Sequence, residues 1–280
     1  MISFPNCKIN LGLTILSPRE DGFHTIDTIF YPLPLLHDVL EIIPANKCDN
    51  NIQFFTTGIN VNINEADNLC CRAFRILQKD YPSLPSIEMH LHKVIPAGAG
   101  MGGGSSDGAF TLKLLNEQFE LSLSNEQLIS YAEQLGSDCP FFIINKPCYA
   151  TGKGEVLEEI SLDLAAYNII LVNPGIHIDT RWAFSNWDKN VNLSDKDRER
   201  KKIEDIIQQP LSTWKKELIN DFEKPVFKNY PLLNEIKQIL YKNGALYAGM
   251  SGSGSTIYGI YEKGSRMPLF EGNEYFIKTV

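Results

Sequence analysis

The sequence predicts an α+β protein, because segments with the pattern of strands and segments with the pattern of helices are mixed along the chain. Residues 38–43 (DVLEII) and 51–57 (NIQFFTT) are rich in β-branched and aromatic residues, and Pro and Asn lie between them, which is typical of strands joined by turns. Residues 68–81 have apolar side chains at helical spacing. This mixture favours helices and sheets packed in α+β layers.

A third strand and two helices are predicted next. Apolar side chains alternate with Glu and His from residue 86 to 95, which indicates a half-exposed antiparallel strand. A glycine-rich loop follows, and a helix is predicted from it to about Phe119. Ser124 and Gln127 have the spacing of a capping box, which predicts the start of another helix that ends near Leu135.

The second half of the chain has fewer clear patterns. Residues 211–243 are helical in pattern, but Pro225 and Pro231 interrupt them. An alternating strand is predicted over 256–261. The charged segment 190–210 is interpreted as a surface insertion or a mobile helix, and the sequence does not reveal its role.

The composition is that of a globular protein, with 280 residues of which 43% are hydrophobic and 21% charged. The net charge of −8 provides no basic field, so we expect no nucleic-acid partner. No segment approaches the length of a membrane span and no secretory signal is evident, so we expect a cytoplasmic protein without a membrane partner. The six cysteines form no C-x-x-C pair, which argues against a zinc site, and Cys139 is interpreted as a packed structural thiol.

Five glycines between residues 98 and 104 mark the first candidate site. Glycine lets the backbone approach a ligand closely and adopt positive φ. The pair Ser106-Asp107 is a natural N-cap for the helix that follows. Loop N–H groups and a helix N-terminus together bind anions, so the segment predicts a phosphate site.

The glycine-rich loop also matches parts of other known motifs. Gly98, Gly100 and Gly103 match the dinucleotide fingerprint, but the preceding strand alternates and is not a buried parallel strand. A Walker loop needs a Lys where Gly104 stands. Residues 104–108 (GSSDG) match a nucleophile elbow, which Asp138 and His177 would complete, but a glycine-rich loop precedes it where a sharp turn is required. A flexible surface turn is the remaining alternative.

Three separated motifs resemble the superfamily of galactokinase, homoserine kinase, mevalonate kinase and phosphomevalonate kinase, the GHMP kinases. They are residues 8–11 (KINL), 96–106 (PAGAGMGGGSS) and 249–259 (GMSGSGSTIYG). Four features resemble the branch whose members phosphorylate 4-diphosphocytidyl-2-C-methyl-D-erythritol. These are PNCKINLGL at 5–13, REDGFHTIDT at 19–28, the triple glycine before SSD, and LGSDCPFF at 135–142.

The resemblance implies a two-domain GHMP kinase fold with a left-handed βαβ unit and an active site in the interdomain cleft. The N-terminal, ATP-binding domain is expected over 1–155 and the C-terminal domain over 156–280. The implied reaction transfers the γ-phosphoryl group of ATP, with Mg²⁺, to the 2-hydroxyl of a cytidine diphosphate-linked methylerythritol, a step of the non-mevalonate isoprenoid pathway. We expect a monomer or a weak homodimer.

The resemblance also implies roles for residues. Lys8 and Asp138 match the catalytic residues, and Asn10 lies beside the reacting hydroxyl. Asn68 and Lys93 match positions near the adenine. The phosphate loop comprises Pro96, Ala97, Gly98, Ala99, Gly100, Met101, Gly102, Gly103, Gly104, Ser105 and Ser106. The cytosine pocket comprises Phe23, His24 and Phe184, with Trp182 or Trp187 as alternatives for the last.

The chemistry of these residue types agrees with the implied roles. An Asp beside an alcohol can take its proton while the bond to phosphorus forms, and a neighbouring Lys stabilises the developing alkoxide. Taken without the resemblance, Asp138 also suits a residue of a helix-terminal loop and Lys8 an ordinary strand lysine. No Mg²⁺ ligand is assigned, because the serine that some superfamily members use falls on a glycine in this sequence. The ion is expected to be held mostly by phosphates and water.

Three alternative functions stay open at this point. Another small-alcohol kinase of the same superfamily, of the homoserine or mevalonate class, would lack a cytidine pocket around His24. A non-catalytic nucleotide-binding protein would keep the fold without the pair formed by Lys8 and Asp138. A serine hydrolase would use Ser106 as its nucleophile.

Overall fold

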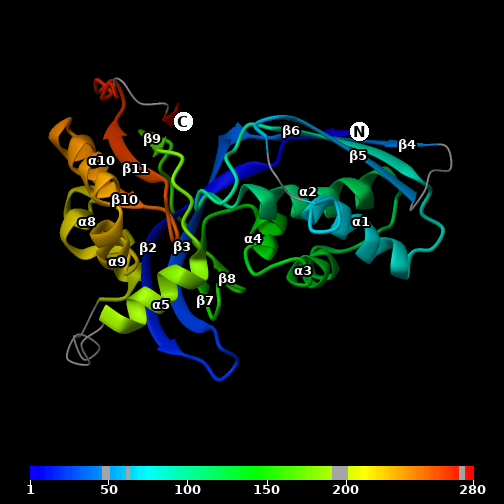
Figure 1. Ribbon diagram of the computed structural model, residues 1–280, viewed down its shortest axis with the longest axis horizontal. Helices are drawn as coiled ribbons and strands as arrows, with labels where there is room; N and C mark the ends of the chain where they lie inside the picture. Colours follow the sequence, from blue (N-terminus) through cyan, green and yellow to red (C-terminus); the bar gives the residue numbers. More distant parts are fainter. Residues whose placement is uncertain (46–50, 61–63, 191–200, 271–274) are drawn as a thin grey trace. The chain divides into compact units, whose positions relative to one another are not determined.

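The computed structural model describes residues 1–45, 51–60, 64–190, 201–270 and 275–280. The chain divides into two compact units (Figure 1). The first unit comprises residues 1–8, 32–97 and 102–146, and the second comprises 9–31, 98–101 and 147–280. Because these units are made of non-consecutive segments, they do not coincide one to one with the consecutive halves 1–155 and 156–280. That division remains a prediction.

The first unit contains a four-stranded sheet in the order β1-β4-β6-β5. Its strands are β1 (Ile2–Ser3), β4 (Val39–Pro44), β5 (Ile52–Gly58) and β6 (Ile87–Lys93). Its helices are α1 (Leu69–Asp80), α2 (Gly103–Gln118), α3 (Asn125–Glu133) and α4 (Cys139–Ile144), which lie on one side of the sheet in Figure 1. Alternate strand residues, such as Leu40 and Met89, are buried on the helix side, while Phe55 on the other side is 53% exposed. The period-2 pattern of these strands thus produces one covered face and one open face.

Strand β6 pairs differently on its two edges. It is antiparallel to β4, as the alternating sequence predicted, but it is parallel to β5. A parallel pair needs a crossover connection, which α1 provides. The segment β5-α1-β6 is therefore a βαβ unit, whose predicted left-handedness remains a prediction.

Side chains cap the starts of two helices, and the capping box predicted for the second is confirmed. Asn68 is the N-cap of α1, and its side chain accepts a hydrogen bond from the N–H of Cys70 at 2.9 Å. Ser124 and Gln127 form the complete capping box of α3, in which each side chain bonds the other residue's backbone N–H. Each cap satisfies backbone donors that lack a partner inside the helix.

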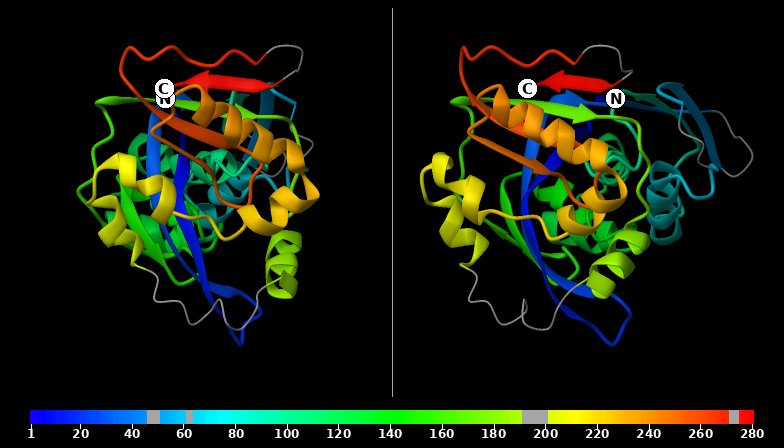
Figure 2. Two further views of the ribbon diagram at one scale, coloured as in Figure 1. Left: turned by 90° about the vertical axis from the view of Figure 1, so that its left-hand side faces the viewer. Right: turned by 60° about the vertical axis from the view of Figure 1, so that its left-hand side comes forward.

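The second unit contains the sheet β10-β11-β9-β12. Its strands are β9 (Tyr167–Asn173), β10 (Tyr247–Met250), β11 (Ile257–Glu262) and β12 (Phe276–Thr279), all antiparallel to their neighbours. Helix α10 (Pro231–Lys242) lies along this sheet (Figure 2). Leu233, Ile236 and Leu240 of α10 are buried at 0–1% exposure in the same core as Val172 of β9. Their helical spacing forms the apolar stripe that covers the sheet.

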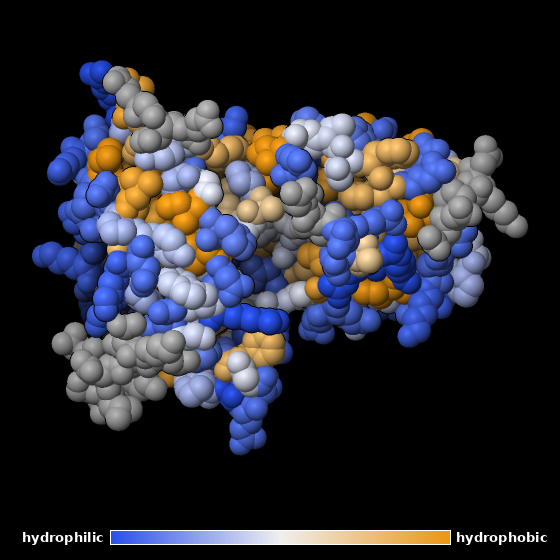
Figure 3. Space-filling view, viewed as in Figure 1, coloured by the Kyte–Doolittle hydropathy of each residue, from blue (hydrophilic) through white to orange (hydrophobic). Residues whose placement is uncertain are grey.

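A further sheet has the order β2-β3-β7-β8. Its strands are β2 (Asn6–Pro18), β3 (His24–His37), β7 (Cys148–Thr151) and β8 (Val156–Glu159). Strands β2 and β3 each include residues of both units. The tip of this hairpin, residues 18–23, is exposed, and mainly hydrophilic side chains cover it (Figure 3).

Of the two interruptions predicted between 211 and 243, the one at Pro231 is confirmed and the one at Pro225 is wrong. The structure has α8 (Leu211–Glu217), α9 (Glu223–Asn229) and α10, which begins at Pro231. Pro225 does not interrupt a helix, because it lies in the first turn of α9, where a missing N–H leaves no intrahelical bond unmade.

The charged segment 190–210 is only partly described, since residues 191–200 lie outside the described residues. Within it, α7 (Ile203–Ile207) buries three isoleucines, so this part belongs to the folded unit. Helix α5 (Thr180–Asn190) precedes the segment. Across the described residues, no helix has the length and apolar character that a membrane span requires.

The capping box of α3 leads to a first prediction. Replacing Ser124 with Ala leaves the N–H of Gln127 without its acceptor, so we expect the free energy of unfolding to fall by about 0.5–2 kcal/mol. Chemical denaturation measures this change. Ser130→Ala, at an exposed position of the same helix, is the matched control and should be neutral or slightly stabilising. Equal losses in both variants would contradict the capping role.

Candidate active site

Lys8 and Asp138, the predicted catalytic residues, lie together in the first unit. Lys8 is on β2 and Asp138 directly precedes α4, where Pro140 supports the helix start. The Lys8 Nζ is 3.3 Å from Asp138 Oδ2. The lysine side chain is only 4% exposed, whereas that of Asp138 is 32% exposed. The pair therefore combines a desolvated cation with a carboxylate that remains accessible to a substrate.

The glycine-rich loop meets this pair at Gly102. A Cβ atom at Gly102 would lie 3.2 Å from Lys8 Cε and 2.9 Å from Phe142 Cζ, and the residue has a φ of +69°. Both the close approach and the left-handed backbone require glycine here. The start of α2 is thus packed directly on the stem of Lys8.

The predicted N-cap at Ser106-Asp107 is wrong. Helix α2 begins at Gly103, with Gly102 as its N-cap, and the N–H of Ser106 already bonds the carbonyl of Gly102 at 2.9 Å. The glycines allow the helix to begin four residues earlier than an N-cap at Ser106 suggests. Gly102, the N-cap, has no side chain with which to cap the helix. The N–H groups of the first turn have no intrahelical partner, so they suit an anion.

The nucleophile elbow is also wrong. Ser106 lies inside α2 and is fully buried, whereas an elbow presents its serine on an exposed turn. Its Oγ and the Oδ1 of Asp107 are buried without a hydrogen-bond partner among the described residues. A serine in this position cannot reach an ester or amide substrate.

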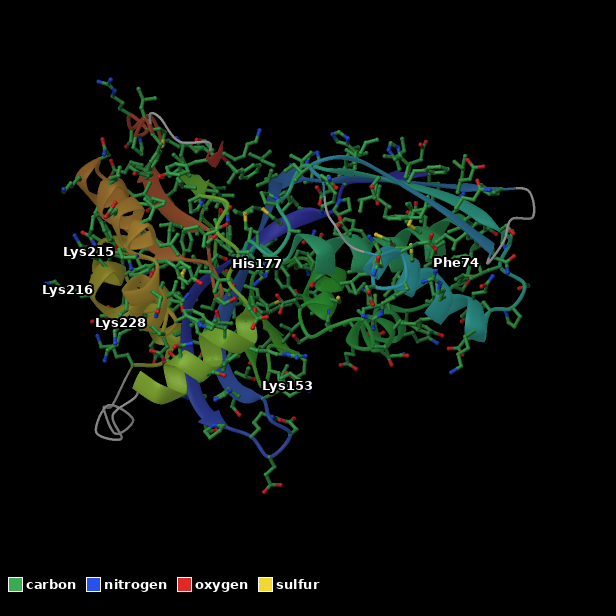
Figure 4. The ribbon with its side chains drawn as sticks, in the orientation of Figure 1. Phe74, Lys153, His177, Lys215, Lys216 and Lys228 are labelled. Carbon is green, nitrogen blue, oxygen red and sulfur yellow. The ribbon has the colours of Figure 1, made fainter. Side chains whose placement is uncertain are left out.

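Loop residues 98–101 belong to the second unit. There they contact a second glycine-rich element, residues 249–259. The hydroxyl of Ser251 donates to the carbonyl of Gly100 at 2.7 Å, and the N–H of Thr256 donates to the carbonyl of Ala99 at 3.2 Å. A Cβ atom at Gly100 would lie 2.2 Å from the Ser251 carbonyl oxygen. At Gly98, a Cβ would lie 3.0 Å from Nδ1 of His177, which Figure 4 labels. These glycines serve packing within the protein.

Gly104 differs from the other loop glycines. In the part of the chain that the structure describes, no atom lies within 4 Å of the position that its Cβ would occupy. At Gly103, by contrast, the nearest atom is Ile95 Cγ2 at 2.8 Å. The space at Gly104 is the one place in the loop where the missing side chain leaves room for something other than the protein.

The two residues predicted near the adenine have other partners in the structure. Asn68 uses its side-chain oxygen to cap α1. The Lys93 ammonium donates to Asp38 and, at 2.7 Å, to Asp107 Oδ2. Burial raises the pKa of Asp107 to about 8, with the Asp38 carboxylate adding to the rise and Lys93 opposing it. A role for Asn68 or Lys93 near the adenine remains a prediction.

The predicted cytosine-pocket residues lie close together in the second unit. The His24 ring stacks on the Phe184 ring, with centroids 4.7 Å apart and planes 10° apart. Trp187 meets His24 edge-on, with ring centroids 5.8 Å apart, so two of the three candidates for the second aromatic ring, Phe184 and Trp187, flank this histidine. Trp182 instead contacts Tyr230.

Phe23, the third predicted member of the pocket, is 56% exposed. The Lys153 ammonium, from the turn between β7 and β8, lies 4.8 Å from the centroid of its ring (Figure 4). An exposed aromatic ring beside a cation suits a pyrimidine nucleotide, which has both a flat base and an anionic diphosphate.

Asn10 is buried beside the second glycine-rich element. Its Nδ2 donates to Thr28 Oγ1 at 3.1 Å, and its backbone N–H donates to Ser251 Oγ at 3.1 Å. Asn10 and Lys8 are alternate residues of β2, so their side chains point to the same side of the strand.

The interpretation of Cys139 as a packed thiol is confirmed. The residue is fully buried, and burial raises its pKa to about 12, with the Ser105 hydroxyl opposing the rise by a hydrogen bond. The described cysteines 7, 70, 71, 139 and 148 are all buried. A thiol with such a pKa is a poor nucleophile at neutral pH.

Sequence reasoning missed several residues that support the site. Asp38 and Asp107 surround Lys93, Phe142 packs on Gly102, and Ser251 bonds the loop. The motif at 249–259 drew attention to Ser251, but no pattern in the sequence links Asp38 to a loop about sixty residues away. Only the sheet brings these segments together.

Comparison with known proteins places this site in a family. Residues 68–146 match the family described as GHMP kinases N terminal domain, and residues 203–268 match GHMP kinases C terminal. A 4-diphosphocytidyl-2-C-methyl-D-erythritol kinase of Azobacteroides pseudotrichonymphae is 49% identical, with 94% of each chain covered. The protein of the same name from Bacteroides thetaiotaomicron is 46% identical, covering 96% of this chain and 94% of the relative.

Solved structures agree with these matches. A crystal structure of 4-(cytidine 5'-diphospho)-2C-methyl-D-erythritol kinase has a TM-score of 0.78 and 29% sequence identity, covering 93% of this chain and 90% of the other. The mevalonate kinase of Methanococcus jannaschii, at 14% identity and a TM-score of 0.66 over 100% and 97% of the chains, shares the fold. On the evidence of both family matches and of these full-length relatives, the chain belongs to the GHMP kinases.

Proposed function

We propose that this protein transfers the γ-phosphoryl group of ATP to the 2-hydroxyl of 4-diphosphocytidyl-2-C-methyl-D-erythritol, giving the 2-phosphate and ADP in the non-mevalonate isoprenoid pathway. The observation that carries the proposal is the ion pair of Lys8 and Asp138, packed against Gly102 at the start of α2. The names of the relatives with nearly full-length matches support the choice of substrate.

The phosphate site comprises the loop 96–106 and the N-terminus of α2. The uncapped N–H groups at Gly103, Gly104 and Ser105 would donate to phosphate oxygens, and the helix dipole favours the same negative charge. The open space at Gly104 would let a phosphate group approach the backbone. Asn68 and Lys93 are proposed to lie near the adenine.

Asp138 would accept the proton of the 2-hydroxyl as its oxygen bonds to the γ-phosphorus and the bond to the ADP oxygen breaks. Lys8 would stabilise the negative charge that develops on the transferred group and its acceptor. Because the lysine side chain is 96% buried, its charge is poorly screened by water and acts strongly at this short range. Asn10, on the same side of β2, is proposed to orient the acceptor.

Magnesium would enter as part of the MgATP substrate. No group of three or more His, Cys, Asp or Glu residues within the described ranges has the arrangement of a metal site. Mg²⁺ commonly binds through nucleotide phosphates and water with one or two carboxylates, so a dedicated protein cage is not required. Its ligands from this chain are left unassigned.

The cytidine end of the substrate is proposed to bind at Phe23, His24 and Phe184. The stacked pair of His24 and Phe184 provides a preformed aromatic surface, and Lys153 provides a positive charge for the diphosphate. We propose that the enzyme acts in the cytoplasm, where ATP is supplied, as a monomer or a weak homodimer without nucleic-acid or membrane partners.

The reaction is tested by coupled ADP release with MgATP and 4-diphosphocytidyl-2-C-methyl-D-erythritol, homoserine or mevalonate as the acceptor. We expect turnover with the cytidyl substrate only. Asp138→Asn removes the proton acceptor with little change in size, so kcat should fall by about 10²–10⁴-fold.

Each other outcome has a distinct meaning. Turnover of homoserine or mevalonate would support kinase activity but contradict the proposed cytidine pocket. No turnover of any acceptor despite ATP binding would indicate a non-catalytic nucleotide-binding protein. Because Asp138 is partly exposed, an unchanged unfolding transition in Asp138→Asn is the control for folding.

The contrast between Gly103 and Gly104 separates ligand binding from packing. Gly104→Ala meets no protein atom and adds a good helix former, so stability should rise by up to about 1 kcal/mol. The KM for ATP should nevertheless rise about tenfold or more, because a misfit of one methyl group costs roughly 1–3 kcal/mol. Gly103→Ala, which meets Ile95, should lower stability instead. Unchanged ATP kinetics in Gly104→Ala would place the phosphates elsewhere.

Phe23→Leu tests the base-stacking role. Since the ring is largely exposed, thermal stability should be unchanged. Loss of one stacked base contact should raise the KM for the cytidyl substrate by about 5- to 150-fold, while the KM for ATP stays constant. An unchanged KM for the cytidyl substrate would contradict the proposal that Phe23 binds the cytosine base.

A further inference from the structure

Asp38 lies directly before β4 and has no exposed surface. Its Oδ1 accepts the backbone N–H groups of Val94 and Ile95, at 2.5 and 2.9 Å. Its Oδ2 accepts a hydrogen bond from the Lys93 ammonium. One carboxylate thus binds three donors from the last residues before the glycine-rich loop.

The same ammonium reaches the other end of the loop. Lys93 Nζ donates at 2.7 Å to Oδ2 of Asp107, which lies in the second turn of α2. The three side chains are at most 5% exposed. The strand that enters the loop and the helix that leaves it are therefore joined by one buried network, which we call the loop clamp (Asp38, Lys93 and Asp107).

Lys93 of the loop clamp and the neighbouring Ile95 also lie close to the first residue of α2. A Cβ atom at Gly103 would lie 2.8 Å from Ile95 Cγ2 and 3.5 Å from Lys93 Nζ. The first residue of α2 is thus packed on the strand end that Asp38 holds. A displacement of that strand end would move the N–H groups at the helix start.

Stability alone is a weak explanation for such a network. Burying one ammonium between two carboxyl groups incurs a large desolvation cost, and apolar side chains of similar size often stabilise a protein as well or better. Charge-assisted hydrogen bonds do fix geometry, because both their lengths and their directions are restricted. A group that must hold several phosphate oxygens at once needs such fixed donors.

We propose that Asp38 and Lys93 are positioning residues for phosphoryl transfer, which hold the two ends of the loop 96–102 in the geometry that binds the ATP phosphates. Neither residue needs to contact the nucleotide for this role. The proposal rests on the proposed use of this loop for ATP, and it adds a specific cause for the loop's arrangement.

Asp38→Asn is the direct test. Asparagine keeps the size and one acceptor oxygen, but it removes the charge that pairs with Lys93. We expect the KM for ATP to rise by about 10- to 100-fold, as for a small misplacement of binding groups, while the KM for the acceptor changes less than about twofold. Lys93→Arg should retain more of the ATP affinity than Lys93→Met, because it keeps the charge.

Asp221→Asn is the matched control. Asp221 is also buried, at 8% exposure, and its carboxylate accepts the backbone N–H of Ile15 at 2.9 Å. Asp221→Asn should lower the free energy of unfolding without raising the KM for ATP more than the KM for the acceptor. All kinetics are measured well below the unfolding temperature of each variant. If Asp38→Asn does not fold, Asp107→Asn tests the other end of the loop clamp with the same expected selectivity.

Calorimetric titration with ATP, without any acceptor, distinguishes this proposal from the function proposed above. If the wild type binds ATP but phosphorylates no cytidyl substrate, the proposed function fails and the loop clamp is still tested by the binding of ATP to the variants. If ATP affinity is unchanged in Asp38→Asn, or if both KM values rise equally, the positioning role is overturned.

Discussion

Close backbone packing at the loop glycines is the constraint on which the rest of the site depends. Gly98, Gly100, Gly102 and Gly103 each lie so near another group that a methyl group would force a displacement. Within the first unit, the backbone of Gly102 lies against the stem of Lys8. Within the second unit, the backbone of Gly100 lies against Ser251. The shape of this loop is therefore set by the packing around its glycines and does not depend on their flexibility.

The charges at the site are arranged by burial. Lys8 is almost fully enclosed while its partner Asp138 keeps contact with solvent, so the pair presents a carboxylate to a substrate and a shielded cation behind it. In the loop clamp, by contrast, the side chains of all three members are buried. Two lysines of the same unit thus lie in different electrostatic surroundings, because one pairs with a partly exposed carboxylate and the other with buried carboxyl groups.

The sequence predicted those features that depend on local patterns or on a family motif. The capping box at Ser124, the strand around Met89 and the pairing of Lys8 with Asp138 belong to this group. The start of α2 was predicted wrongly, because a serine–acid cap is a strong local signal and the glycine N-cap is set by packing on Phe142. The partners of Lys93 could not be predicted, since Asp38 reaches it only through the register of β4 and β6.

The open space at Gly104 has a consequence for protein engineering. Every other glycine of the loop is fixed by its neighbours, so Gly104 is the one position of the loop where a side chain can be added without rebuilding the protein around it. A small residue there would narrow the proposed phosphate site. Variants of this protein that prefer an ATP analogue with a smaller phosphate end can therefore be sought by changing Gly104 alone.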